Sequence, residues 1–411
     1  MKPKDAGSVA RPGVAPLLTA AAAVLLLAGF APALGAQAWI IGPDIPVAAA
    51  SFAVCPAVAM GGGADFEVVW NNRYSESHPI PQGIFVRHFD REGRPTHRRV
   101  FRLDSPDNLE TSSALVAALP DSGYFVVWFE YRTRSAIAGR FLDSAGRPRG
   151  PVIALARGGH PVAAVVVDGG LLVAWKESPR GILRARRFDL AGRPLGGEMR
   201  LATLGDLGAV SLAPLADSFV AAWERWTGKS WVTETQRFSL AGEPLESPVK
   251  VSSSRLSGPF RVEVASDGGD RFAVAWTRRE RLSETQTDDE TRARFFDAGG
   301  ASSPEAHPNE LPAGNQEVMG LAMDGRGLAL VTWHSDRNHT ASALDVAGRF
   351  LTASGQPASK AFPLSQNLSG NDLCPAAATS GSDEWAVAWL KQGTGVFARR
   401  LVFKADSVAA E

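Results

Sequence analysis

The sequence predicts an all-β fold, a seven-bladed β-propeller made of four-stranded antiparallel blades. A unit of about fifty residues recurs seven times along the chain, and each unit consists of short extended runs separated by turn residues. A strand-like segment also precedes the first unit. Its position predicts that the N-terminal strand closes the ring.

The composition is that of a globular protein. Of the 411 residues, 45% are hydrophobic and 21% are charged, and the formal net charge is zero. The 41 glycines and 27 prolines indicate frequent turns. Nucleic acids and anionic membranes attract basic proteins, so zero net charge removes the electrostatic case for either partner.

Residues 1–38 have the layout of a secretory signal peptide. A positively charged start precedes an almost wholly apolar run at 14–30, and an A-x-A cleavage site ends at Ala38. The alternative is an uncleaved anchor, because the apolar run is nearly long enough to span a bilayer. We expect cleavage, which leaves residues 39–411 as a periplasmic or secreted propeller with no further membrane span.

The repeat is clearest in seven apolar runs of strand type, each of which ends in tryptophan. Successive members of this set are 47 to 58 residues apart, so seven units fill the chain and leave no room for a second domain. A position repeated in every blade faces an equivalent environment seven times, so we expect these side chains to pack between blades. The tryptophans are Trp70, Trp128, Trp175, Trp223, Trp276, Trp333 and Trp389.

A second block keeps a twelve-residue register in all seven units. Its fourth position is arginine in six of them, with Gln236 as the exception, and its tenth position is glycine in six. The D-x-x-G-x-P ending is typical of a tight turn, in which aspartate bonds its own backbone and glycine supplies a positive φ. Each unit is therefore four strands, A to D, with tight A-to-B and C-to-D turns and a variable B-to-C loop. We expect the arginines to lie over the tryptophan rings or to pair with the following aspartates. The blocks begin at residues 84, 137, 183, 233, 291, 346 and 396.

The two ends of the chain predict ring closure. The last unit stops after its C strand, and the segment 42–51 resembles the D strands of the other units. Cys55 and Cys374 each lie 15 residues before the tryptophan of their unit, so they meet only if the ring closes. Exported thiol pairs oxidise readily, which favours a disulfide. The alternative is two unpaired buried thiols, if the Cα atoms are more than about 7 Å apart.

These repeats resemble a group of secreted bacterial β-propeller repeat proteins. That group has strands of the FVVAW type followed by I-x-A-R-R-F-D-x-x-G-x-P, and the resemblance covers nearly all of the chain after the leader. It implies a propeller-like fold outside the cytoplasm. It implies no common activity, so no functional residue is carried over.

Function is expected where the blades differ, which is in the B-to-C loops on one face of the ring. Aromatic and arginine side chains dominate the binding energy of protein surfaces. The alternative is that these loops are solvated and have no particular role. The candidate ligand-binding residues are Tyr74, His78, Tyr131, Arg132, Arg134, Trp226 and Arg278.

Signals for an enzyme are weak. His334, Asp336 and His339 do not have a zinc spacing, and neither G-x-S-x-G nor H-E-x-x-H occurs, so we expect no metal, cofactor or assignable catalytic residue. The acidic run 288–290 could bind a cation or act as acid and base, but a charge run in the longest loop is more often solvated.

The sequence therefore favours a monomeric, exported binding or interaction module over an enzyme. Its expected ligand is a carbohydrate or an envelope protein, held on the loop-rich face or at the mouth of the central channel. One alternative is an exported glycan-active hydrolase or lyase with acids drawn from several blades. Another is a purely structural envelope protein, which would bind no small ligand.

Overall fold

The computed structural model describes most of the chain from Ala38 to Lys404. Within the described residues there are 28 strands, and no helix is long and apolar enough to cross a membrane. The described ranges are 38–49, 53–72, 82–105, 111–131, 136–177, 181–203, 207–254, 261–281, 287–309, 314–336, 345–365 and 370–404.

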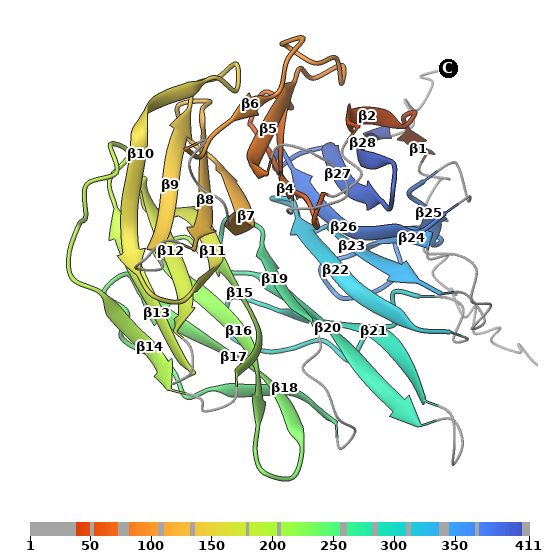
Figure 1. Cartoon of the computed structure of the whole chain (residues 1–411). Helices are drawn as coiled ribbons and strands as arrows, with labels where there is room; N and C mark the ends of the chain where they lie inside the picture. The colour runs from red at the N-terminus through yellow and green to blue at the C-terminus, as the bar shows by residue number, and fades with distance from the viewer. Residues whose placement is uncertain are drawn as a thin grey trace, which may run out of the picture. The chain divides into compact units, whose positions relative to one another are not determined.

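The strands form seven antiparallel blades in a ring, which confirms the predicted β-propeller (Figure 1). Blade one contains β3 (Ala57–Met60), β4 (Phe66–Asn72), β5 (Gly83–Phe89) and β6 (Phe101–Arg102). Blade two contains β7 (Thr111–Ala118), β8 (Tyr124–Glu130), β9 (Ala136–Leu142) and β10 (Pro148–Arg157). Blade three contains β11 (His160–Val167), β12 (Gly170–Glu177), β13 (Ile182–Phe188) and β14 (Met199–Thr203). Blade four contains β15 (Leu207–Pro214), β16 (Ser218–Trp226), β17 (Trp231–Ser239) and β18 (Val249–Ser254).

The remaining blades follow the same order of strands. Blade five contains β19 (Val262–Ser266), β20 (Phe272–Arg281) and β21 (Thr287–Phe296). Blade six contains β22 (Gln316–Met323), β23 (Ala329–Ser335), β24 (Asp345–Leu351) and β25 (Phe362–Pro363). Blade seven contains β26 (Asp372–Thr379), β27 (Glu384–Lys391) and β28 (Gly395–Lys404), and its outer strand comes from the N-terminal part of the chain.

The ring is closed as the sequence predicts, by N-terminal residues that complete blade seven. Two short strands, β1 (Ala38–Ile41) and β2 (Ile45–Ala48), both pair antiparallel with β28. The prediction placed this strand within 42–51, and β1 extends it toward the N-terminus. Between β1 and β2, Asp44 accepts a hydrogen bond from the guanidinium of Arg399, which is only 2% exposed.

A disulfide joins the first and last blades, as predicted. Cys55 immediately precedes the inner strand of blade one, and Cys374 lies in the inner strand of blade seven. Their Cα atoms are 5.2 Å apart although 319 residues separate them in sequence. The alternative of two unpaired thiols is therefore wrong.

The core consists of seven apolar clusters, one between each pair of neighbouring blades. Each cluster contains one tryptophan of the repeat, and none of the seven is more than 3% exposed. Burying a large aromatic side chain stabilises a fold by about 2–3 kcal/mol. The tryptophans therefore pack between neighbouring blades and stabilise the ring, as expected.

The C-to-D turns also form as predicted. Asp90 Oδ1 accepts hydrogen bonds from the backbone N–H groups of Glu92 and Arg94 at 3.0 and 2.9 Å, and Gly93 has a φ of 79°. Gly146 occupies the same turn position in blade two, with a φ of 75°.

The repeated arginines serve the scaffold in a way that the sequence did not indicate. Arg140 donates from Nε to the carbonyl of Gly150 in the outer strand of its own blade, and from Nη1 to Leu103 of the preceding blade. Arg349 makes equivalent bonds to two backbone carbonyls. An expected contact between a repeated arginine and a tryptophan forms in blade seven, where the guanidinium carbon of Arg399 lies 5.9 Å from the centroid of the Trp389 ring.

Blade five departs from the predicted four strands. Within the described residues it has three strands, and the segment after β21 forms isolated bridges to that strand at Ser302 and Ala306 instead of a continuous ladder. Pro304 and Pro308 lie in this segment. Proline has no N–H to donate to a strand ladder, so the segment cannot pair continuously.

Candidate functional site

The two faces of the ring differ in the length of their connections. Because successive strands of a blade run in opposite directions, the B-to-C connections lie on one face, and the A-to-B and C-to-D turns lie on the other. We call these the loop face and the turn face. The described part of the loop face includes Tyr131 and Trp226, at or next to the ends of their B strands, and Arg278, three residues before the end of β20. Four candidates lie outside the described residues: Tyr74, His78, Arg132 and Arg134.

Tyr131 belongs to an aromatic group that joins blades two and three. Its side chain is 47% exposed, and its ring meets the ring of Phe129 edge-on, with centroids 4.5 Å apart. His160 is at the start of the inner strand of blade three. The centroid of its ring lies 4.2 Å from that of Phe129 and 6.0 Å from that of Tyr131. Burial, followed by the charge of Lys176, lowers the pKa of His160. A neutral imidazole thus lies beside an exposed phenol ring on the loop face.

The other two described candidates make contacts within the protein. The ring of Trp226 lies 5.7 Å from that of Trp231, its partner across the β16–β17 hairpin. Arg278 donates a 3.2 Å hydrogen bond to Glu305, beyond the end of β21. The structure therefore does not bring the described candidates into a single cluster.

The acidic run 288–290 is not solvated, so that expectation was wrong. Strands β20 and β21 extend far into the predicted loop and carry these residues in β21, where none is more than 4% exposed. Asp289 accepts hydrogen bonds from Arg279 at 2.7 and 2.8 Å. Opposite charges meet at two pairs across the extended strands, Arg278 with Glu290 and Arg279 with Asp289, which favours the extension, whereas Glu280 faces Asp288.

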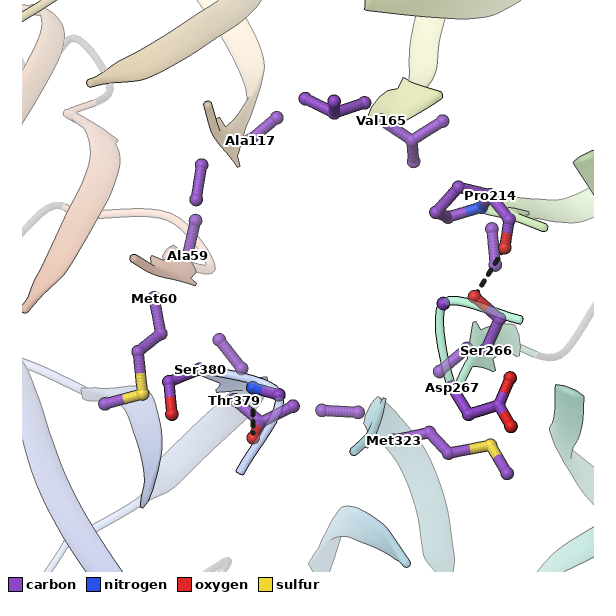
Figure 2. Close-up of a pocket in the computed structure, with 18 of the residues that line it drawn as sticks. Ala59, Met60, Ala117, Val165, Pro214, Ser266, Asp267, Met323, Thr379 and Ser380 are labelled. Atoms are coloured by element: carbon purple, nitrogen blue, oxygen red, sulfur yellow. Dashed lines mark hydrogen bonds between the residues drawn. The ribbon is translucent and has the colours of Figure 1, made fainter. Parts of the chain in front are cut away.

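A cavity of about 530 Å³ occupies the central channel toward the turn face. All seven inner strands line it, mostly with small apolar side chains such as Ala59, Ala117 and Val165 (Figure 2). Its polar side chains lie in two places, Ser266 with Asp267 in blade five and Thr379 with Ser380 in blade seven, and Ser266 donates a hydrogen bond to the carbonyl of Pro214. The lining of this cavity therefore provides few side chains that could bind a polar ligand or take part in a reaction.

The opposite mouth of the channel, on the loop face, carries ionisable side chains on some blades only. In every blade except blade four, one residue in or just before the inner strand lies across from the residue that follows the repeated tryptophan. In blades three, five and six this residue is His160, Arg261 and Glu317. In blades one, two and seven it is Val54, Ser112 and Leu373.

Arg261, Glu263, Glu317 and His334 form what we call the mouth cluster. Arg261 Nη1 lies 3.8 Å from the carboxylate of Glu263, which also accepts a 3.4 Å hydrogen bond from Ser211 Oγ. His334 Nε2 lies 3.5 Å from the carboxylate of Glu317. The side chains of Glu263 and Glu317 are 25% and 40% exposed.

The two glutamates of the mouth cluster differ in acidity. Burial raises the pKa of Glu263 above its usual value, and the nearby Arg261 and Ser211 offset only part of this effect. The hydrogen bond with His334 lowers the pKa of Glu317, and the charge of Arg261 acts in the same direction. Two carboxyl groups whose environments shift their pKa values in opposite directions are typical of acid–base sites.

The sequence analysis did not identify Arg261, Glu263 or Glu317, because all three lie in or next to inner strands rather than in loops. A signal was present, since the runs RVEVAS and QEVMGLAM place charges where most other units have small or apolar residues. Of the three residues considered for a metal, His334 joins the mouth cluster, and Asp336 accepts hydrogen bonds from Asn315. His339 lies outside the described residues. Across the described ranges, no three His, Cys, Asp or Glu side chains are grouped as metal ligands would be.

A second polar cluster lies between blades one and two, near the turn face. Asp65 accepts a 2.6 Å hydrogen bond from Tyr124 and lies 3.0 Å from Nε2 of His88. Glu67 is fully buried, and neither of its carboxyl oxygens has a hydrogen-bond partner. Burial, together with the charges of Asp65 and Asp143, raises the pKa of Glu67 well above its usual value.

No protein-family profile and no curated protein matches the sequence. Several solved structures are similar in fold. Hydrazine synthase from Kuenenia stuttgartiensis superposes with a TM-score of 0.54 at 13% identity, covering 85% of this chain and 95% of that one. An ulvan lyase, a polysaccharide lyase, superposes with a TM-score of 0.55 at 9% identity, covering 87% and 93%. The same lyase bound to -[GlcA(1-4)Rha3S]- gives 0.55 at 9% identity, covering 88% and 95%. At these identities the likeness concerns the fold alone.

Proposed function

We propose that the protein binds carbohydrate at the loop-face mouth of its central channel. The observation that carries this proposal is the uneven distribution of polar and aromatic groups around that mouth. Ionisable residues occupy it on blades three, five and six, whereas the equivalent residues of blades one, two and seven are not ionisable. A position that served only the scaffold would be the same in every blade.

The chemistry of the mouth suits a sugar chain. Carboxylates and a guanidinium form charge-assisted hydrogen bonds with hydroxyl groups, and Arg261 can also pair with the carboxylate of an acidic sugar. Tyr131, which is half exposed, offers an aromatic face to the apolar side of a sugar ring. The ulvan lyase, which acts on a polysaccharide, supports the proposal as a fold that serves glycans elsewhere.

Export is part of the proposal. The leader at 1–38, the Cys55–Cys374 disulfide and the finding that no described helix could span a membrane are compatible with a periplasmic or secreted protein. N-terminal sequencing of the protein from its native cells tests this: a mature chain that begins at Trp39 is expected, and an intact Met1 would contradict it.

A glycan-array screen tests the binding proposal. The wild type should bind a defined set of glycans, and Arg261→Ala and Tyr131→Ala should each reduce binding to that set at least tenfold. Arg193→Ala is the matched control, because Arg193 is 81% exposed on the turn face, where it pairs with Asp189. A blank array, or equal loss in all three variants, would contradict the proposal.

A further inference from the structure

We propose that the mouth cluster hydrolyses the glycan that it binds, with Glu263 as general acid and Glu317 as general base. This inference deepens the proposed function and rests on it, because the glutamates can act only on a chain held at the channel mouth. It adds an activity and assigns a role to each of two residues.

Glu263 and Glu317 lie near the loop-face ends of the inner strands of adjacent blades. Glu263 is the second residue of β19 and Glu317 the second residue of β22, the inner strands of adjacent blades. Val262 and Val318 each lie across from the repeated tryptophan of their blade. Glu317 precedes Val318 by one residue and so lies nearer the loop face than the tryptophan, whereas Glu263 follows Val262 by one residue and lies farther from the loop face. Glu263 is thus deeper in the channel, and Glu317 is nearer the loop face.

Arg261 is in contact with Glu263, and its charge also acts on Glu317. Its guanidinium is 3.8 Å from the carboxylate of Glu263, and its charge also stabilises the ionised form of Glu317. The Arg261 side chain is 44% exposed, which leaves it able to bind a negatively charged or hydroxyl-rich ligand next to Glu263.

The directions of the two pKa shifts suit the two roles. Burial favours the neutral form of Glu263, which has a proton to give, and its 3.4 Å hydrogen bond from Ser211 holds the side chain in place. His334 and Arg261 favour the ionised form of Glu317, which can accept a proton. In such a pair the difference in environment assigns the acid and the base.

The reaction balances with water as the only co-reactant. Glu263 gives its proton to the glycosidic oxygen as the bond from that oxygen to the anomeric carbon breaks. A water molecule forms the new bond to the anomeric carbon, and Glu317 takes a proton from that water. The released sugar carries the proton of Glu263, and proton exchange with solvent returns both glutamates to their starting states.

A purely structural role explains the mouth cluster less well. The Arg261–Glu263 contact is long and partly exposed, and such pairs contribute little to stability. Blades one, two and seven form the same part of the ring with Val54, Ser112 and Leu373 instead of charged residues.

The test is the release of reducing ends from the glycans that bind on the array. The wild type should release product, and Glu263→Gln and Glu317→Gln should each slow release by about 100-fold or more while binding is retained. Glu243→Gln, on an exposed turn of the turn face, is the matched control and should not change the rate. Glu263→Asp and Glu317→Asp keep the carboxyl group at a shorter reach and should fall between the wild type and the glutamine variants.

The pH profile and chemical rescue separate the roles. The wild-type rate should fall at low pH as Glu317 is protonated and at high pH as Glu263 ionises. Azide, a small nucleophile that needs no general base, should restore turnover to Glu317→Gln and not to Glu263→Gln. Glycans that bind without releasing any product would overturn the catalytic proposal and leave the binding proposal standing, whereas a blank array would overturn both. Product release that is unchanged in both glutamine variants would also overturn the assignment.

Discussion

Glu67 should make the protein less stable as the pH rises, and Glu67→Gln should remove that dependence. The side chain is fully exposed to solvent only after unfolding, where its pKa is close to the usual 4.5. In the folded protein, burial raises that pKa, so the folded state binds more protons than the unfolded state between the two values. The contribution of Glu67 to the free energy of unfolding is therefore greatest at low pH and is lost progressively as the pH rises through this window.

The slope of this loss follows from the proton count. One proton bound by the folded state alone lowers the free energy of unfolding by about 1.4 kcal/mol for each pH unit, which is about 2 °C in melting temperature for a chain of this size. The assay is thermal unfolding at half-unit steps from pH 5 to pH 8, with Glu243→Gln as the exposed control. The difference between the wild type and Glu67→Gln should grow with pH, while the control should follow the wild type. Parallel curves for wild type and Glu67→Gln would refute the reasoning.

Three further changes should alter stability in directions that the structure specifies. Replacing Cys55 and Cys374 with serine should lower the free energy of unfolding by about 2–4 kcal/mol, seen as a lower melting temperature under non-reducing conditions; an unchanged value would show that the bridge does not restrain the unfolded chain. Gly146→Ala should lower the free energy of unfolding, measured by chemical denaturation, by about 1–3 kcal/mol more than Gly150→Ala. Both glycines have φ near +70°, but a Cβ at Gly146 would lie 2.3 Å from the Cβ of His88, whereas a Cβ at Gly150 would meet open space. Equal losses would contradict that close approach. Asp44→Asn should lower the free energy of unfolding by about 1–3 kcal/mol, because it removes the charged acceptor of the Arg399 guanidinium, which is buried in β28. An unchanged free energy of unfolding in the same assay would show that this contact does not stabilise the closed ring.

The scaffold was predictable because its signals are local and repeated. The spacing of the tryptophans and the D-x-x-G-x-P turns fix the number of blades, and the shared register of Cys55 and Cys374 indicates where the ring closes. The exceptions come from single blades. Pro304 and Pro308 interrupt the outer strand of blade five, and the charge pairs between β20 and β21 turn a predicted loop into strand.

The site was less predictable because it depends on which residues of different blades meet. Arg261 and Glu317 are 56 residues apart in sequence, and only the ring brings their strands side by side. Glu263 interrupts an apolar strand pattern, which by itself indicates only an exception to the repeat. Its raised pKa arises from its surroundings in the folded protein. The loop candidates were chosen for residue type, whereas the mouth cluster is defined by position on the inner strands.

The measurement that tests the central claim most directly is hydrogen–deuterium exchange of the mature protein with and without the strongest glycan from the array. A glycan held at the loop-face mouth should slow exchange at the starts of β19 and β22, near Arg261 and Gln316, and leave the A-to-B turns of the opposite face unchanged. Protection confined to the turn face, for example around the turn at 61–65, would show that the glycan binds elsewhere and would contradict the account.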